Sequence, residues 1–322
     1  MEQYLSAKRI VDKRFSKEDS FYSLYVLALF GLLQKYPNDR KAIHDLFQRL
    51  DIFIEDESIP DIMRNHDMDV SLFFEEDEVN SNFCATYGLS SRGDSLEFDE
   101  DGEVSKVEEK PFIICSSKDC SPTDLLHIFV HEFNHLIKSY HNGFGIEKRK
   151  DFSGYFIRSG INIYRCYYKK NEDMLYEEDY FSTMDEVLNV LQTTDIVTYV
   201  LLLDGIVPDP EIQKKIDSLD KEALLQDFGY NSGVQLIRPL WKNDFFQSLV
   251  EANIVTGNIA EIIDGFDFLL EPKAFEKLCD ALDELDELES KGQKGTRLLQ
   301  VKKYISSIVD RYNKQTQKVY EK

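Results

Sequence analysis

The chain has 322 residues, of which 42% are hydrophobic and 12% aromatic, enough to build a packed core in one large domain or two modest ones. Its formal net charge of -22 at pH 7 argues against nucleic acid and anionic membrane surfaces as partners, because their phosphate groups repel an acidic protein. The five cysteines are scattered and lack CxxC spacing, which is typical of reduced thiols. We therefore expect a cytoplasmic globular protein.

The first 50 residues are expected to form an N-terminal helical cap. The pattern predicts one helix over Ser16–Tyr36 and a second over Arg40–Leu50, separated by a break at residues 37–39. The apolar run Phe21–Leu33 is too short to span a bilayer, and acidic residues precede it, so it is interpreted as a buried helix and not as a secretory signal.

From residue 51 to residue 119 the pattern changes to short apolar runs separated by acidic turns. It predicts strands over Phe83–Leu89, Ser95–Phe98 and Lys110–Ser116, with a hairpin turn at Asp99–Gly102. The acidic clusters in this segment lack the spacing of a calcium-binding loop, and we interpret them as solvated loops.

The following segment contains the motif HExxH, as His131-Glu132-Phe133-Asn134-His135. On a helix, His131 and His135 lie on the same face and can offer two nitrogens to one tetrahedral zinc ion. Glu132 is rotated by about 100° from His131, so it can act as a general base on a metal-activated water without being a ligand. The sequence therefore predicts a zinc site on this helix.

Capping signals bound the predicted motif helix. Ser121 is the expected N-cap, Pro122 the first helical residue and Asp124 the acid of a capping box, while Asn142-Gly143 is a stop signal. Most of the remaining helix surface is apolar, so the motif side chains would be polar groups in a buried setting, which need a partner such as a metal.

The rest of the chain is predicted to be mainly helical after a hairpin. Gly154–Tyr168 is expected to form two strands around Ser159-Gly160, and a capping signature opens a long helix from about Ser182 to Leu203. Turns are predicted at Pro208–Pro210, Gly229, Gly257 and Gly265, and a flexible connection at Glu289–Gly295 is predicted to lead into a last helix from about Arg297 to Tyr320.

This last segment differs in charge from the rest. Residues 291–322 carry nine Lys or Arg against two acids, a net +7, so the rest of the chain carries -29. We expect the basic helix to dock on the acidic body, and an exposed partner-binding tail is the alternative.

A catalytic zinc site needs a third protein ligand, and the sequence offers two candidates. His141 has the spacing of a metzincin ligand, but Lys138 occupies the position of the turning glycine, and a continuous helix would carry His141 away from the metal. Glu186 lies on the later helix, where Glu186, Asn189 and Thr193 share one polar stripe. Glu186 is the favoured ligand, and its alternative role is in a capping box with Thr183.

HEFNH followed about fifty residues later by DEVLNVLQTTD resembles the gluzincin branch of the zincin metallopeptidases. It is similar to uncharacterised HExxH proteins of Gram-positive bacteria. The resemblance implies an α+β fold, with a mostly antiparallel sheet packed on the HExxH helix and a largely helical C-terminal subdomain. Val190 departs from it, because the related ExxxD pattern has an acid there, and Asn189 would have to orient a histidine instead.

The resemblance covers roughly residues 80–265. Together with the sequence pattern it predicts an N-terminal cap over residues 1–50, a zincin-like catalytic domain over 51–290 and a basic C-terminal helix over 291–322. The catalytic domain would have an upper part, 51–145, and a mainly helical lower part, 146–290.

We therefore expect a zinc-dependent metallopeptidase that hydrolyses peptide or protein substrates, with His131, His135 and Glu186 as metal ligands and Glu132 as base. The resemblance suggests Tyr230 as the donor to the oxyanion, with Tyr176, Tyr180 and His127 as alternatives. A non-enzymatic zincin-like regulatory or interaction protein is the alternative function, and the sequence does not indicate an oligomeric state.

Overall fold

The protein is α+β and folds into two compact units. The computed structural model describes residues 2–74, 88–91, 95–98, 104–148, 152–169, 174–202, 209–219 and 231–320. The first unit comprises Met1–Ser95, Val107–Ile137 and Gln192–Gln226, and the second comprises Leu96–Lys106, Lys138–Leu191 and Asp227–Lys322. Two long helices, α6 (Pro122–Tyr140) and α7 (Ser182–Leu201), each continue from one unit into the other.

The first unit begins with three helices, α1 (Glu2–Asp12), α2 (Tyr22–Lys35) and α3 (Arg40–Arg49), which confirm the predicted helical start of the chain. α8 (Pro210–Asp217) belongs to the same unit. α2 is buried on nearly all sides, because almost every residue in it is apolar. It approaches α7 closely at Gly31, where a Cβ atom would lie 2.6 Å from Cγ2 of Ile196.

A three-stranded sheet completes the first unit, with the order β1-β5-β2. β1 (Asp51–Glu55) runs parallel to β5 (Phe112–Ser116), and β2 (Gly88–Ser91) runs antiparallel to β5. β5 confirms one predicted strand, whereas residues 83–87 of another lie outside the described residues. β1, the helix α4 (Ile59–Asn65) and the short 3-10 turn η1 (Val70–Leu72) were not predicted.

A separate pair of strands, β3 (Ser95–Phe98) and β4 (Val104–Glu108), forms a two-stranded sheet. β3 has the predicted bounds, and the predicted turn at residues 99–102 lies outside the described residues.

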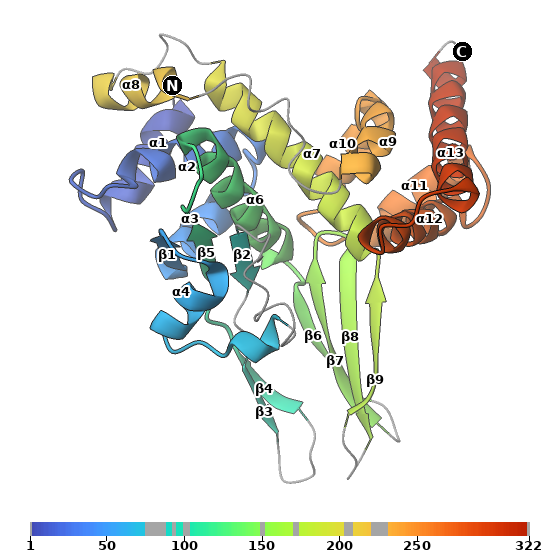
Figure 1. Cartoon of the computed structure of the whole chain (residues 1–322), viewed down its shortest axis with the longest axis horizontal. Coiled ribbons are helices and arrows are strands. Elements are labelled where there is room, and N and C mark those ends of the chain that lie inside the picture. Colours follow the sequence, from blue (N-terminus) through green and yellow to red (C-terminus); the bar gives the residue numbers. More distant parts are fainter. Residues whose placement is uncertain are drawn as a thin grey trace. The chain divides into compact units, whose positions relative to one another are not determined.

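The second unit contains a four-stranded antiparallel sheet, in which β6, β7, β8 and β9 are neighbours in chain order (Figure 1). The strands span Phe144–Lys148, Phe152–Ser159, Asn162–Lys169 and Met174–Tyr180. β7 and β8 confirm the predicted hairpin, and Gly160 at its turn has a positive φ of 60°, which glycine adopts without strain. In the sequence, the four strands lie between α6 and α7.

Five helices follow in the second unit: α9 (Asn231–Trp241), α10 (Asp244–Asn253), α11 (Ile259–Leu269), α12 (Ala274–Ser290) and α13 (Thr296–Tyr320). The turn predicted at Gly257 is present, with a φ of 75°. The turn predicted at Gly265 is wrong, because Gly265 lies inside α11, where it gives room to Leu249 of α10. The turn predicted at Gly229 lies outside the described residues.

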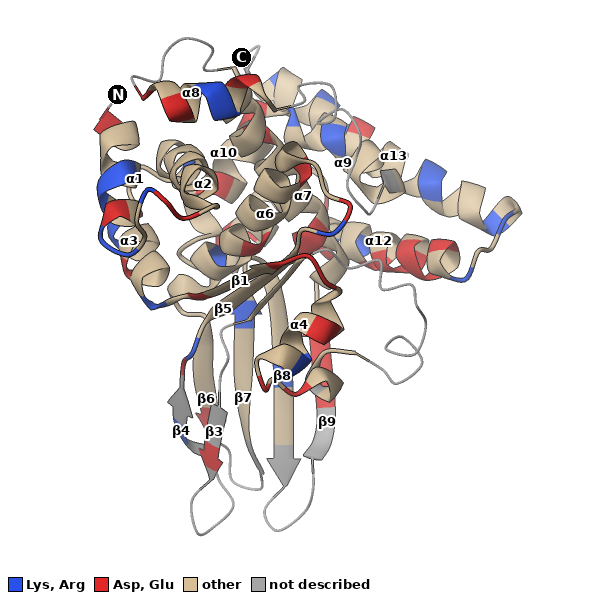
Figure 2. Cartoon of the chain, turned by 60° about the vertical axis from the view of Figure 1, so that its left-hand side comes forward, with Lys and Arg blue, Asp and Glu red and all other residues tan. Residues whose placement is uncertain are grey.

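The prediction that the basic C-terminal helix docks on the acidic body is confirmed within the second unit. Figure 2 shows acidic residues along α12 and basic residues along α13. Arg297 and Lys302 of α13 pair with Glu284 and Glu289 of α12 at 2.5 and 2.7 Å. Apolar residues of α13 are buried as well, including Ile305, Ile308, Val309 and Tyr312. Hydrophobic burial therefore contributes to docking together with these half-exposed ion pairs.

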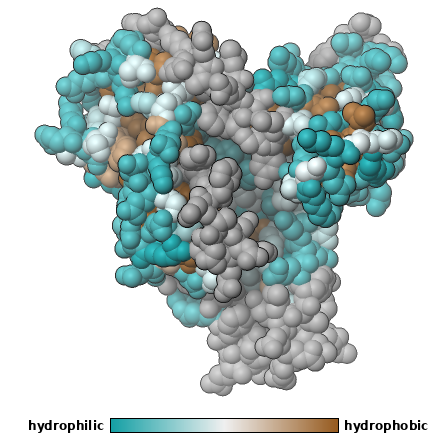
Figure 3. Space-filling view, in the orientation of Figure 1, coloured by the Kyte–Doolittle hydropathy of each residue, from teal (hydrophilic) through white to brown (hydrophobic). Residues whose placement is uncertain are grey.

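The surface shown in Figure 3 is mostly hydrophilic over the described residues, with small hydrophobic areas between polar ones. In the described part of the chain, no helix combines the length and the apolar composition that crossing a membrane requires.

Candidate metal centre

The helix that carries the HExxH motif has the predicted bounds. The backbone N–H of Ser121 donates to the Asp124 carboxylate at 2.9 Å, and the N–H of Asp124 donates to the Ser121 hydroxyl at 3.2 Å. These two bonds form the expected capping box, and Pro122 is the first helical residue. α6 ends at Tyr140, before Asn142 takes a left-handed conformation with φ of 52°.

Aromatic packing fixes the orientation of α6 in the first unit. The ring of Phe129 lies 5.5 Å from that of Tyr25 on α2, and the ring of Phe133 lies 6.3 Å from that of Phe47 on α3. Both phenylalanines are fully buried. With this side of the helix held in the core, His131 and His135 lie on another side and stay half-buried.

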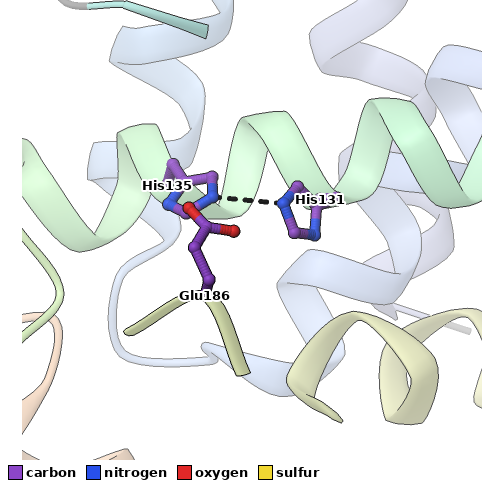
Figure 4. Close-up of side chains that lie close together, drawn as sticks. All are labelled: His131, His135 and Glu186. Carbon is purple, nitrogen blue, oxygen red and sulfur yellow. Dashed lines mark hydrogen bonds between the residues drawn. The ribbon is translucent and has the colours of Figure 1, made fainter. Parts of the chain in front are cut away.

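The two histidines present nitrogen atoms to one another at the spacing of a metal site. Their Nε2 atoms lie 3.2 Å apart, and the ligand atoms of His131, His135 and Glu186 all lie within 4.8 Å of one another (Figure 4). Zinc–nitrogen bonds of 2.0–2.1 Å at a tetrahedral angle place two nitrogens roughly 3.3 Å apart. The observed separation therefore fits two imidazoles on one zinc ion, with Glu186 as the third donor.

Hydrogen bonds and an ion pair join α6 and α7 within each unit. In the first unit, the Tyr36 hydroxyl donates to Asn134 at 2.6 Å, and the Asn134 amide donates to Gln192 on α7 at 3.4 Å. In the second unit, Lys138 of α6 pairs with Asp185 of α7 at 3.4 Å.

The carboxylate of Glu132 faces strand β2. The Ser90 hydroxyl donates a hydrogen bond to Oε2 of Glu132 at 2.7 Å. Two residues earlier, Gly88 leaves room for the same side chain, since a Cβ atom there would lie 2.5 Å from Oε1 of Glu132. Gly88 and Ser90 lie on the same face of the strand, so β2 orients the predicted base.

Burial changes the proton affinity of two side chains on α6. It lowers the pKa of His127 to about 3, with a smaller contribution from nearby His131, so His127 is neutral at pH 7. Its ring stacks on that of His131 with centroids 6.5 Å apart. Burial also lowers the pKa of Lys138, while Asp185 and then Glu186 oppose this shift by favouring the charged ammonium.

Two other candidate residues, His141 and Tyr180, have exposed side chains. His141 is exposed in the turn after α6, and its backbone carbonyl accepts a hydrogen bond from Arg158. The ring of Tyr180, at the end of β9, is exposed and contacts Arg165, whose guanidinium carbon lies 5.8 Å from the ring centroid. The side chain of Tyr176 and all of Tyr230 lie outside the described residues.

Sequence reasoning missed the residues that support the predicted ligands and base. Ser90 and Gly88 gave no signal, because small residues on a short strand are common. Lys138 and Asp185 did carry a signal, because each is a charged residue on a largely apolar helix. Asp185 is next to a predicted ligand, and Lys138 is one turn from another.

The chain was compared with known proteins at three levels. No protein-family model, no curated protein and no solved structure matches it.

Proposed function

We propose that the protein is a zinc-dependent metallopeptidase with a zincin-like fold, in which His131, His135 and Glu186 hold the metal. The observation that carries the proposal is the 3.2 Å spacing of the two Nε2 atoms together with a carboxylate from a second helix. Two imidazoles and one carboxylate are the protein ligands of zinc sites that keep a fourth position open for catalysis. A structural zinc site would usually have four protein ligands.

The ligands would hold zinc at a place that solvent reaches, because all three are only half-buried. Zinc, when bound, supplies a Lewis acid that lowers the pKa of a water molecule and polarises a peptide carbonyl. Both histidines must be neutral to bind it, so binding is expected to weaken as the pH is lowered.

Glu132 is the proposed general base. It follows the first ligand directly, is almost fully buried, and has one carboxylate oxygen held by Ser90. The other oxygen can accept the proton of the attacking water and pass it to the leaving amine. Tyr230 is proposed as the oxyanion donor on the resemblance alone.

The free edge of strand β2, among the described strands, is an argument for a peptide substrate. Among the described strands, β5 is the one neighbour of β2, so its second edge has no described strand beside it. An extended peptide can pair with such an edge through backbone hydrogen bonds. A peptide added there would run along the strand that orients Glu132.

The decisive experiment compares the wild type with Glu132→Gln on a broad peptide library read by mass spectrometry. The amide preserves shape but cannot accept the proton, so we expect a folded, zinc-loaded variant whose cleavage is roughly 100- to 10,000-fold slower. Elemental analysis establishes zinc content in both proteins.

Two results would count against the proposal. Equal products at equal rates from both proteins would assign the cleavage to a contaminant or to another site. A zinc-loaded wild type that cleaves no peptide would favour the regulatory protein instead.

A further inference from the structure

The ion pair between Lys138 and Asp185 is almost completely buried, with side chains 0% and 3% exposed. Lys138 lies one turn after His135 on α6, and Asp185 immediately precedes Glu186 on α7. Removing two charges from water costs several kcal/mol per ion, and replacing such a pair with apolar residues is often neutral or stabilising. Fold stability alone is therefore a poor explanation for a buried charge pair at this place.

Other parts of the second unit fix the carboxylate of Asp185. The backbone N–H of Ile161 donates to its Oδ1 at 2.9 Å. Gly160 lies so close that a Cβ atom there would be 1.9 Å from the same oxygen. The turn between β7 and β8 thus leaves Asp185 little room to move, and the Lys138 ammonium lies 3.4 and 3.5 Å from its two oxygens.

Arg158 connects this turn to the end of α6. It is 3% exposed and donates to the carbonyl of Gly160 at 2.6 Å and to that of Asn142 at 3.3 Å. The start of α7, the β7–β8 turn and the end of α6 are therefore joined by a continuous set of buried and partly buried polar contacts. Few of these contacts can shift alone, because each donor has an acceptor fixed by another element.

We propose that Lys138 and Asp185 are positioning residues for the metal centre: the pair fixes the start of α7 against α6, so that Glu186 meets His131 and His135. This inference rests on the proposed zinc site. It adds that the three ligands are not sufficient by themselves, because Glu186 must also be held in place by the ion pair of its neighbour Asp185. Contacts behind metal ligands typically contribute 10- to 100-fold in metal affinity.

The test is zinc affinity, measured on the full chain by competition with a chromophoric chelator. Asp185→Asn keeps the size of the side chain and an oxygen that can accept from Ile161, but removes the charge. Lys138→Met keeps most of the volume. We expect each variant to bind zinc about 10- to 100-fold more weakly than the wild type.

A second ion pair on α7 provides the matched control. Lys35 of α2 pairs with Asp195 of α7 at 3.8 Å, and its two side chains are 14% and 43% exposed. Lys35→Met and Asp195→Asn repeat the same substitutions away from Glu186. We expect both control variants to retain the zinc affinity of the wild type.

A third variant disturbs Asp185 without removing a charge. Gly160→Ala places a methyl group on the carboxylate and is expected to weaken zinc binding as well. Gly292→Ala is its control, because Gly292 has a similar positive φ of 62° and no atom within 4 Å of an added Cβ. Gly292→Ala therefore reproduces the backbone strain without the contact, and it should leave zinc affinity unchanged. If Lys138→Met fails to fold, Gly160→Ala still tests the proposal.

The outcomes separate this inference from the proposed function. A wild type that binds zinc, with Asp185→Asn and Gly160→Ala binding it equally tightly, overturns the positioning role and leaves the metallopeptidase standing. Equal weakening in the Lys35 and Asp195 variants also overturns it, because the effect would then be a general consequence of losing an ion pair. A folded wild type that binds no zinc overturns both.

Discussion

Gly88→Ala is expected to slow peptide cleavage while leaving the fold and the zinc in place. The added Cβ would lie 2.5 Å from Oε1 of Glu132 and 2.7 Å from Cγ2 of Ile128, and Cβ atoms essentially never approach other atoms within 3.0 Å. The carboxylate or the strand must therefore move by at least 3.0 - 2.5 = 0.5 Å. The Glu132 oxygen is the end of a flexible side chain and can move, whereas Cγ2 of the β-branched Ile128 is stiff, so the strand takes up part of the shift.

The displaced atom belongs to the proposed base, which is why a small shift should be visible in the rate. Catalytic groups must be held to within about 0.5 Å, and a misplacement of about 1 Å can cost 100-fold. We expect kcat/KM to fall by roughly 10- to 100-fold.

The assay measures kcat/KM on a peptide that the wild type cleaves, with zinc content and melting temperature recorded for each protein. Ser91→Ala is the control, because successive residues of a strand point to opposite faces and Ser91 faces away from Glu132. A Gly88→Ala protein with wild-type kcat/KM, or the same loss in Ser91→Ala, would refute the role assigned to this face of β2.

Three further predictions concern the metal centre and the helix that carries it. Glu186→Ala should weaken zinc binding strongly in a chelator titration and His141→Ala should not; the opposite ranking would make His141 the third ligand. Zinc at 1,000 times its dissociation constant should stabilise the fold by about 4 kcal/mol, so calorimetry with a chelator should show a lower melting temperature, and an unchanged one would contradict metal binding. Tyr36→Phe leaves the buried Asn134 oxygen without this donor and should cost about 1–3 kcal/mol in urea unfolding; no measurable loss would mean that the bond contributes little.

The sequence was most informative where local chemistry decides the structure. The bounds of α6 followed from Ser121, Asp124 and Asn142-Gly143, because caps and stop signals act within a few residues. The grouping of Glu186 with the histidines was also predictable, since a polar stripe on an apolar helix must face a polar partner.

Features that depend on distant parts of the chain were not predictable in this way. The parallel pairing of β1 with β5 joins segments about sixty residues apart, and nothing local in either segment specifies it. Lys138 was noticed only as a departure from a glycine position, although it pairs with Asp185, 47 residues later. Gly265 was interpreted as a turn because glycine usually breaks helices, whereas here Leu249 requires the space.

The position of the four-stranded sheet in the chain sets an order for folding. His135 and Glu186 are 186 - 135 = 51 residues apart, and strands β6 to β9 occupy most of that interval. Bringing the ends of such a loop together costs conformational entropy, and contacts of this range form slowly. Of the three proposed zinc ligands, only His131 and His135 lie on one helix, so the proposed ligand set becomes complete only when a distant segment joins them. A newly synthesised chain is therefore expected to complete the proposed zinc site late in folding.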